Sequence, residues 1–317
     1  MKNHKRLGKG LEDISHLFLS TDEKQRTSSQ ELPAPSPPVK KNTEHHFPRV
    51  VAVTGDHRSL EKSFLVSNLA IELARRGHQV RVLDADLNFP DQPFLWGLRP
   101  GESMAYWAMA QENAQESQVV LQGPYGSRLL CLDIDFSKLS ALPETIRRRL
   151  LARLMAFEAD AQVMLVDVSA SLNSNSRLIL QMAHQIVVLV PSDHLGMIDA
   201  YAAIKRILGL RPNALVGMVA YNIRMVAEAE AVTNRMTQVV RKFLNSDITN
   251  LGFLFADLNI VKSISQRKPL ALSSIRSKAA TCLSLIAERI MAQEETGAQT
   301  GSSSFFASLF QALEDRP

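Results

Sequence analysis

Cysteine and long hydrophobic runs are scarce in this chain. Only two cysteines occur in 317 residues, and Cys131 and Cys282 are far apart in sequence, so both are predicted to be buried thiols in a reducing cytoplasm. No CxxC or Cys/His cluster indicates a metal site. No run of about 18 apolar residues is present, and the first 20 residues hold no continuous apolar stretch. We therefore expect a cytoplasmic protein without a membrane-spanning helix or a secretory signal.

A large charge of one sign is also absent. The sequence has 36 Lys and Arg against 32 Asp and Glu, a net charge of +4, and the basic residues are scattered. We therefore expect no specific nucleic-acid partner. The composition of 45% hydrophobic and 21% charged residues is typical of a soluble globular protein with a sizeable core, which excludes fibrous structure and disorder throughout.

Composition divides the chain into four parts. Residues 1–19 contain a short amphipathic segment, for which docking on its own domain and binding a partner are both open. Residues 20–48 are rich in Ser and Pro and are predicted to be a disordered linker. Residues 49–292 are predicted to form one domain, and 293–317 a flexible spacer followed by an amphipathic helix.

Short β-branched runs alternate with helical periodicities from residue 49 onward. This alternation predicts a doubly wound α/β fold with about seven mostly parallel strands and helices on both faces. The predicted strands are 49–54, 79–86, 129–135, 162–167, 185–190, 214–221 and 251–255. The predicted helices are 62–76, 143–157, 196–208, 226–244 and 276–293.

Polar residues follow the predicted strands where a doubly wound sheet forms its ligand crevice. After the first strand, a loop leads to Lys62 and Ser63 at a helix start, the layout of a phosphate-binding loop. The second strand ends in Asp84 and Asp86, and the fourth ends in Asp167, placed to hold Mg²⁺ or its water shell. Each feature alone fits a cap or a turn, but their joint order favours a nucleotide site.

These segments resemble the MinD/ParA-type deviant-Walker P-loop ATPases. The resemblance is carried by VVAVT, KSFLVSNLAIELARRGHQVRVLDADL, the Walker B-like VMLVDVSASL and the next strand and helix, VVLVPSDHLGMIDAYAAIKRIL. MVAYNIRMVAEAEAVTNRMTQVVRKFL and LGFLFADLNIVKSISQRKPL look most like the FlhG branch, the flagellar-number ATPases. The similarity covers residues 49–291 and implies a P-loop NTPase fold of the SIMIBI type.

The resemblance implies that ATP binds with Mg²⁺. Lys62 and Ser63 match the phosphate and magnesium positions of the family. Asp86 matches the acid that orients the attacking water, and Asp167 matches the Walker B acid that helps to hold the metal.

At the other end of the implied nucleotide site, two residues match the positions that contact the base. Asn222 matches the asparagine that, in the family, follows a strand and contacts the adenine base. Asp257 falls in the later loop that flanks the base, although Phe255 stands where the family usually has Pro.

The phosphate loop lacks every glycine of the family pattern Lys-Gly-Gly-Val-Gly-Lys-Ser. His57 replaces the first lysine, Arg58 and Ser59 replace the paired glycines, and Glu61 replaces the last glycine. Each non-glycine residue forced into left-handed backbone space costs about 1–2 kcal/mol, although Arg58 can offset part of this as a phosphate contact. We therefore expect ATP hydrolysis to be weak or lost, which leaves enzymatic activity open.

Three classes of function fit this pattern. The first is a nucleotide-responsive spatial regulator with protein partners and a homodimeric state, and the second is a pseudo-ATPase scaffold that binds partners through its terminal segments. The third groups two disfavoured relatives. A polysaccharide tyrosine kinase is indicated only by Pro90, since none of the four tyrosines lies in the tail, and an amidoligase would need a second substrate module.

The C-terminal segment predicts an amphipathic helix. Its apolar face is formed by Phe305, Phe306, Leu309, Phe310 and Leu313. MinD-like proteins end in such a helix that lies on the membrane, which implies a peripheral location at the inner face of the cell membrane. Here the polar face has few basic residues for anionic lipids. A lipid surface, a protein partner and the chain's own domain all remain open as its binding site.

Overall fold

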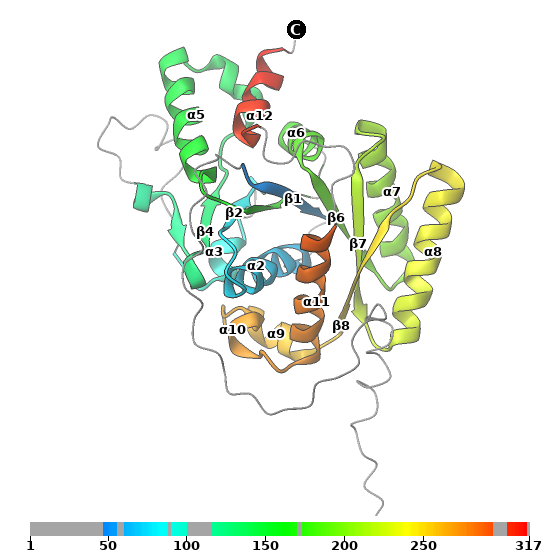
Figure 1. Ribbon diagram of the computed structural model, residues 1–317. Coiled ribbons are helices and arrows are strands. Elements are labelled where there is room, and N and C mark those ends of the chain that lie inside the picture. Colours follow the sequence, from blue (N-terminus) through cyan, green and yellow to red (C-terminus); the bar gives the residue numbers. More distant parts are fainter. Residues whose placement is uncertain are drawn as a thin grey trace, which may run out of the picture. The chain divides into compact units, whose positions relative to one another are not determined.

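The computed structural model describes residues 47–55, 60–87, 90–99, 116–169, 171, 173–293 and 303–315. In this part of the chain, eight strands form a sheet in the order β3-β4-β2-β5-β1-β6-β7-β8, parallel except for the β3–β4 pair (Figure 1). The strands are β1 (Arg49–Thr54), β2 (Val80–Asp84), β3 (Leu121–Gln122), β4 (Arg128–Cys131), β5 (Val163–Asp167), β6 (Gln185–Pro191), β7 (Leu215–Ile223) and β8 (Thr249–Phe255).

Helices cover both faces of the sheet. α2 and α11 pack together on one face, and α5, α6, α7 and α8 lie on the other (Figure 1). The helices are α2 (Leu60–Arg75), α3 (Gln92–Leu95), α5 (Glu144–Glu158), α6 (Ser174–Met182), α7 (His194–Leu210), α8 (Val226–Leu244), α9 (Leu258–Ser265), α10 (Leu270–Ser273), α11 (Lys278–Ala292) and α12 (Phe305–Glu314). The described residues also include three 3₁₀ turns, η1 (Glu116–Gln118), η2 (Pro124–Gly126) and η3 (Phe136–Ala141).

The doubly wound, mostly parallel fold predicted from the sequence is confirmed. The central strands β2, β5 and β6 are buried along their whole length, as the apolar runs of β5 and β6 predict, whereas β2 includes the buried Arg81. Side chains cap the following helices: Asp193 accepts from the Gly196 N–H at 2.9 Å at the start of α7. A Cβ at Gly196 would lie 2.2 Å from Pro191 Cγ, so glycine is required at this close approach.

Several boundaries differ from the prediction. The sheet has eight strands rather than about seven because β3 is a two-residue edge strand, too short to leave an alternating pattern. α2 begins at Leu60, two residues before the predicted start. The strand predicted at 129–135 ends at Cys131, and α6 was not predicted at all.

The chain order reverses beside β1. From β1 the chain passes α2 to reach β2 on one side, and from β5 it passes α6 to reach β6 on the other. Such a reversal is where doubly wound sheets bind ligands, outside the carboxyl ends of the strands. The register pairs Asp84 with Asp167 and Val53 with Asp167, so two acids lie side by side at this point.

Part of the predicted organisation lies outside the described residues. The amphipathic segment at 1–19 and nearly all of the linker at 20–48 are among these, as is the spacer at 294–302. Within the residues that the structure describes, none of the helices combines the length and the apolar character needed to span a bilayer.

Candidate functional site

The first turn of α2 holds the lysine and serine predicted to contact phosphate. Lys62 and Ser63 are only 4% and 3% exposed, because α2 packs on β1, β2 and β5. Lys62 Nζ lies 3.5 Å from Asp167 Oδ1 at the end of β5. The structure therefore brings Lys62 and Asp167 together as a buried ion pair, in which each charge compensates the other.

Asp84 is a second buried acid in this cluster. Burial and, next in size, the neighbouring Asp167 charge raise the pKa of Asp84 well above its usual range. The backbone N–H groups of Gln92 and Asp86 donate to its carboxylate at 3.0 and 3.2 Å and offset part of this effect. Two adjacent carboxylates with one lysine form a site that favours an additional cation.

Asp86, the predicted catalytic acid, lies two residues beyond the end of β2. Its side chain is half-buried, unlike the fully buried Asp84. Its charge helps to raise the pKa of Asp91, together with the larger effects of burial and Asp167. Asp86 thus lies at the rim of the Lys62–Asp167 cluster, where solvent can reach it.

Gln92 is a central member of the cluster that the sequence reasoning missed. Its side chain is fully buried, and its Nε2 donates to the Ser63 carbonyl oxygen and to Asp167 Oδ2, both at 2.9 Å. Its backbone N–H also binds Asp84. In the sequence, Gln92 could have been noticed only as a single polar residue shortly after Asp84 and Asp86. Such a residue by itself does not indicate a functional site.

The two residues predicted to contact adenine lie farther along the sheet. Asn222 is exposed near the end of β7, with a left-handed backbone at φ 60°. Asp257 caps α9: its carboxylate accepts from the Asn259 N–H at 2.8 Å and from the Ala279 N–H at 3.4 Å. β7 is three strands from β5, about 14 Å at the usual strand spacing, so these residues contact neither Lys62 nor Asp167.

The part of the phosphate loop that lacks glycine is mostly outside the described residues. Residues 56–59, which include Arg58, belong to this part. Glu61 is described and lies half-buried in the first turn of α2, next to Lys62.

The C-terminal helix α12 packs on its own domain. It contacts α5, α6 and η3, and the buried side chains of its apolar face are Phe305, Phe306, Leu309 and Phe310. Leu313 is half-buried. Of the three alternatives for this face, the structure shows it packed on the chain's own domain, because the groove between α5 and α6 offers enough apolar surface to bury it.

Glu158 lies at the docked end of α12. Both of its carboxylate oxygens are buried without a hydrogen bond of standard geometry. Burial raises the pKa of Glu158 to about 7, although the Ser304 hydroxyl and the N–H groups of Phe306 and Phe305 lower it in part. The seat of α12 therefore contains a group that changes charge near neutral pH.

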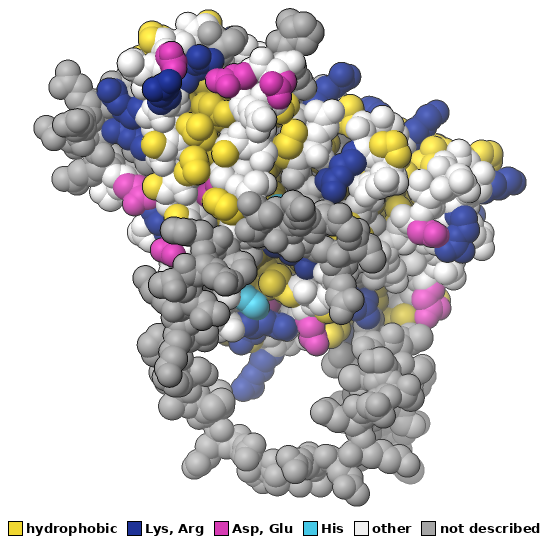
Figure 2. Space-filling view, turned by 45° about the horizontal axis from the view of Figure 1, so that its top comes forward, with side chains coloured by type: hydrophobic (Ala, Val, Ile, Leu, Met, Phe, Trp, Pro, Cys, Tyr) yellow, Lys and Arg dark blue, Asp and Glu magenta, His cyan; other side chains and the backbone are white. Residues whose placement is uncertain are grey.

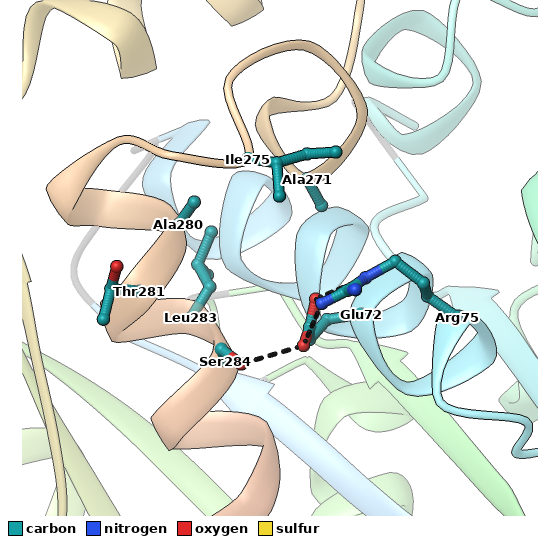
Figure 3. A pocket seen from close by; sticks show the side chains of 8 residues that line it. All are labelled: Glu72, Arg75, Ala271, Ile275, Ala280, Thr281, Leu283 and Ser284. Carbon is teal, nitrogen blue, oxygen red and sulfur yellow. Dashed lines mark hydrogen bonds and ion pairs between the residues drawn. The ribbon is translucent and has the colours of Figure 1, made fainter. Parts of the chain in front are cut away.

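A pocket of about 160 Å³ lies on the flank of α2, between α10 and α11 (Figure 3). Its wall includes Glu72, whose carboxylate accepts hydrogen bonds from Arg75, Arg76 and Ser284. These bonds lower the pKa of Glu72 against the larger opposing effect of burial. Glu72 lies ten residues beyond Lys62 in α2, about 15 Å along the helix, so this pocket is separate from the cluster.

The side chains of the cluster fit a nucleotide with a magnesium ion in their chemistry. A lysine, a serine and two carboxylates lie at the helix start and the strand ends, and hard cations such as Mg²⁺ prefer oxygen ligands. Among the described residues, no group of three or more His, Cys, Asp or Glu could hold a metal by itself. A magnesium ion would therefore need phosphate oxygens or water as further ligands.

Comparison with known proteins identifies relatives of the chain. No family model matches it. It is 24% identical over 245 residues to the antiactivator FleN of Pseudomonas aeruginosa, covering 77% of this chain and 87% of FleN. It is 21% identical over 277 residues to the flagellum site-determining protein YlxH of Helicobacter pylori, covering 84% of this chain and 90% of YlxH.

Solved structures share the fold. The MinC:MinD cell division protein complex of Aquifex aeolicus matches with a TM-score of 0.59 and 16% identity over 80% of this chain and 100% of that one. MinD of Pyrococcus horikoshii, complexed with Mg-ADP, matches with a TM-score of 0.59 and 15% identity. The match covers 79% of this chain and 100% of that one. A ParA family ATPase of Chlorobium tepidum matches with a TM-score of 0.55 and 14% identity, covering 76% of this chain and 98% of that one.

The chain has the fold of the MinD/ParA-type P-loop ATPases, and its strand-end cluster lies at the edge of the sheet where doubly wound folds bind ligands. The sequence relatives, an antiactivator and a flagellum site-determining protein, are similar to the chain over most of its length and support its resemblance to the FlhG branch. The resemblance predicted from the sequence is confirmed.

Proposed function

We propose that this protein is a nucleotide-responsive spatial regulator that controls the position or number of a cellular structure, with ATP hydrolysis weak or lost. The observation that carries the proposal is the buried cluster of Lys62, Asp84 and Asp167 at the reversal of strand order. Buried ionisable side chains are costly, and three of them at the edge of a sheet where this fold binds ligands support a binding role over a structural one.

Each residue of the cluster has a task in nucleotide binding. Lys62 binds the β- and γ-phosphates, and the Ser63 hydroxyl and Asp167 hold the magnesium ion or its water shell. Asn222 contacts the adenine from the end of β7, with Asp257 beside it. Asp84 and Asp167 would lie beside the positive charge that a magnesium ion supplies when it is bound. The chain's own part is to order the segment after Asp167 and so change the surface that partners contact.

Weak hydrolysis follows from two features. The loop lacks the three glycines with which the family pattern turns N–H groups onto phosphate, and the first lysine of that pattern is replaced by His57. Asp86 lies at the rim, where solvent competes for any water that it orients. Binding without efficient turnover would give a long-lived switched state.

Titration of the full chain with a fluorescent ATP analogue and Mg²⁺ tests the proposal. Saturable binding should weaken at least about tenfold in Lys62→Ala, because a phosphate contact in a site of low dielectric is lost. Lys205→Ala, an exposed lysine on α7, is the matched control and should bind like the unaltered protein. No binding at millimolar analogue would refute the nucleotide switch.

A pseudo-ATPase scaffold is the second candidate. It is favoured by the complete burial of the cluster, in which Lys62 and Gln92 already occupy both oxygens of Asp167. In this case the sheet only displays binding surfaces. The absence of binding in the same titration, in a protein that remains folded, would select this candidate.

Apolar side chains near the proposed site support protein partners, including a second copy of the chain. Leu195 and Ile198 on α7 and Leu258 and Val261 on α9 are exposed, Leu258 by 86%. Both helices begin directly after strands of the same sheet edge, β6 and β8. Light scattering with and without Mg-nucleotide tests for a homodimer, and a mass that remains monomeric in both would exclude it.

The C-terminal helix supports a location in the cytoplasm, peripheral at the inner face of the membrane when α12 is released. α5 and α12 border a groove with a hydrophobic floor and charged sides (Figure 2). The Arg147–Glu314 pair at 3.6 Å bridges the two helices. Crosslinking Arg147→Cys to Glu314→Cys with a bis-maleimide that contains a cleavable disulfide should abolish liposome binding, and reduction of the linker should restore it. Equal pelleting in both states would refute release of α12.

A further inference from the structure

Gln92 has no task in the proposed function, although it lies inside the proposed site. It is the first residue of α3, four residues long, and its side chain points away from solvent toward the ends of β2 and β5. A buried glutamine is costly unless its amide is hydrogen-bonded, so its presence among charged residues calls for a reason.

The orientation of the amide follows from its partners. The Ser63 carbonyl oxygen and Asp167 Oδ2 are both acceptors, so the amide nitrogen must face them, at 2.9 Å each. The amide oxygen is then buried without a hydrogen-bond partner. An unpaired buried acceptor raises the free energy of this arrangement and makes it easier to open.

Both oxygens of Asp167 are occupied by the chain's own donors. Lys62 Nζ lies 3.5 Å from Oδ1, and Gln92 Nε2 donates to Oδ2. Asp84 is likewise bound on both oxygens by backbone N–H groups, one of them from Gln92 itself. A cation reaching this pair of acids therefore meets a donor of the chain's own on each oxygen of Asp167.

We propose that Gln92 is a latch on the metal side of the site: its amide holds the Asp167 oxygen that a Mg²⁺ ion or its water shell would use. Mg²⁺ competes with this amide for that oxygen, which lowers the affinity of the site for the metal. The inference rests on the proposed function, because it assigns a regulation to the same site. It makes Gln92 a positioning residue that acts through Asp167.

The displacement also couples the metal to α3. The backbone N–H of Gln92 donates to Asp84 Oδ2, so a rotation of Gln92 away from the acids loosens the start of α3. Phe94 on α3 lies under the Arg267 guanidinium, 4.5 Å from its ring centre, which connects α3 to the segment after α9. Metal binding is therefore expected to increase hydrogen exchange in α3.

Thermal unfolding with MgCl₂ alone tests the latch without nucleotide. Gln92→Leu keeps the size of the side chain and removes the amide. At 10 mM MgCl₂ we expect a rise in Tm of less than about 1 °C for the unaltered protein and of about 4 °C or more for Gln92→Leu, because ligand binding to the native state stabilises it. Gln185→Leu is the matched control, since Gln185 is equally buried and binds Arg49 at the other end of the sheet. Equal Mg²⁺ shifts in all three proteins would overturn the latch.

The nucleotide arm separates this inference from the proposed function. With a fluorescent ADP analogue, Mg²⁺ should improve binding by less than about twofold in the unaltered protein and by at least about tenfold in Gln92→Leu. If neither protein binds the analogue but Mg²⁺ alone still stabilises Gln92→Leu, the latch stands and the proposed function falls. If both bind it with the same Mg²⁺ effect, the latch falls and the proposed function stands.

Hydrogen exchange on the unaltered protein provides a second test should Gln92→Leu fail to fold. Saturating MgCl₂ should speed exchange of the Gln92 backbone N–H at least about threefold, because its bond to Asp84 is weakened when the latch opens. The Ala271 N–H, which binds Asn68 at 2.9 Å elsewhere on α2, is the internal control and should not change. An unchanged Gln92 N–H at saturating metal would overturn the proposal.

Discussion

Replacing Glu158 with glutamine tests how α12 is held on the domain. Glu158 is the last residue of α5, fully buried against the start of α12. Its pKa is raised from 4.5 to about 7, so the native state favours the protonated acid more strongly than the unfolded chain does. The stability that protonation gives is complete below about pH 4.5 and is lost as the pH rises to about 7.

The size of the effect follows from linkage. At about 1.4 kcal/mol for each pH unit between 4.5 and 7, the charged carboxylate lowers the free energy of unfolding by about 3 kcal/mol. A glutamine at this position would be neutral at every pH and would keep the shape of the side chain. We therefore expect Glu158→Gln to stabilise the protein by about 2–3 kcal/mol at pH 8 and to leave it nearly unchanged at pH 4.5.

Urea unfolding of both proteins from pH 4.5 to 8.5 measures this difference. Glu144→Gln is the matched control, because it makes the same change on an exposed side chain of the same helix, and it should show no such pH dependence. A constant difference between Glu158→Gln and the unaltered protein across this range would refute the buried, charge-sensitive seat of α12.

Three further predictions concern stability. Lys62→Ala should lower the free energy of unfolding by about 3–5 kcal/mol, because it leaves Asp167 buried without its cation. Adding Asp167→Asn should restore most of this loss. A double variant that is no more stable in urea than Lys62→Ala would contradict the ion pair. Phe306→Ala should cost about 3–5 kcal/mol by opening a cavity under α12, and an unchanged urea midpoint would show that α12 is not docked in solution. Asp257→Ala should cost about 1 kcal/mol by removing the α9 cap, whereas no change in the unfolding midpoint would argue against that role.

Much of the site could be predicted because its residues come at strand ends. The apolar run before Asp167 and the β-branched and apolar residues before Asp84 fix those strands, and parallel strands bring their carboxyl ends to one edge. Lys62 at a helix start after the first strand then falls at the same edge. Gln92 could not be found in this way, because α3 has four residues and leaves no periodic signal.

The roles of Asp84 and Asp86 show the limit of a sequence motif. Both follow the same strand, and the resemblance assigns the reacting position to Asp86. Burial separates them: Asp84 is enclosed beside Asp167, whereas Asp86 is at the rim. Which of two nearby acids is desolvated depends on the loop path after the strand, and no local pattern encodes that path.

By itself the amino-acid order determined the sheet, the place of the ligand edge and the apolar face of the last helix, because each depends on local periodicity and on where strands end. Only the tertiary structure decided which surface that helix covers and which side chains contact the carboxylate oxygens of Asp167. Its face fits lipid, a partner or the groove between α5 and α6 equally well on the sequence, and the choice of the groove depends on apolar surface that distant segments form together. The Gln92 contacts have the same origin, since they join three segments that meet only in the folded chain.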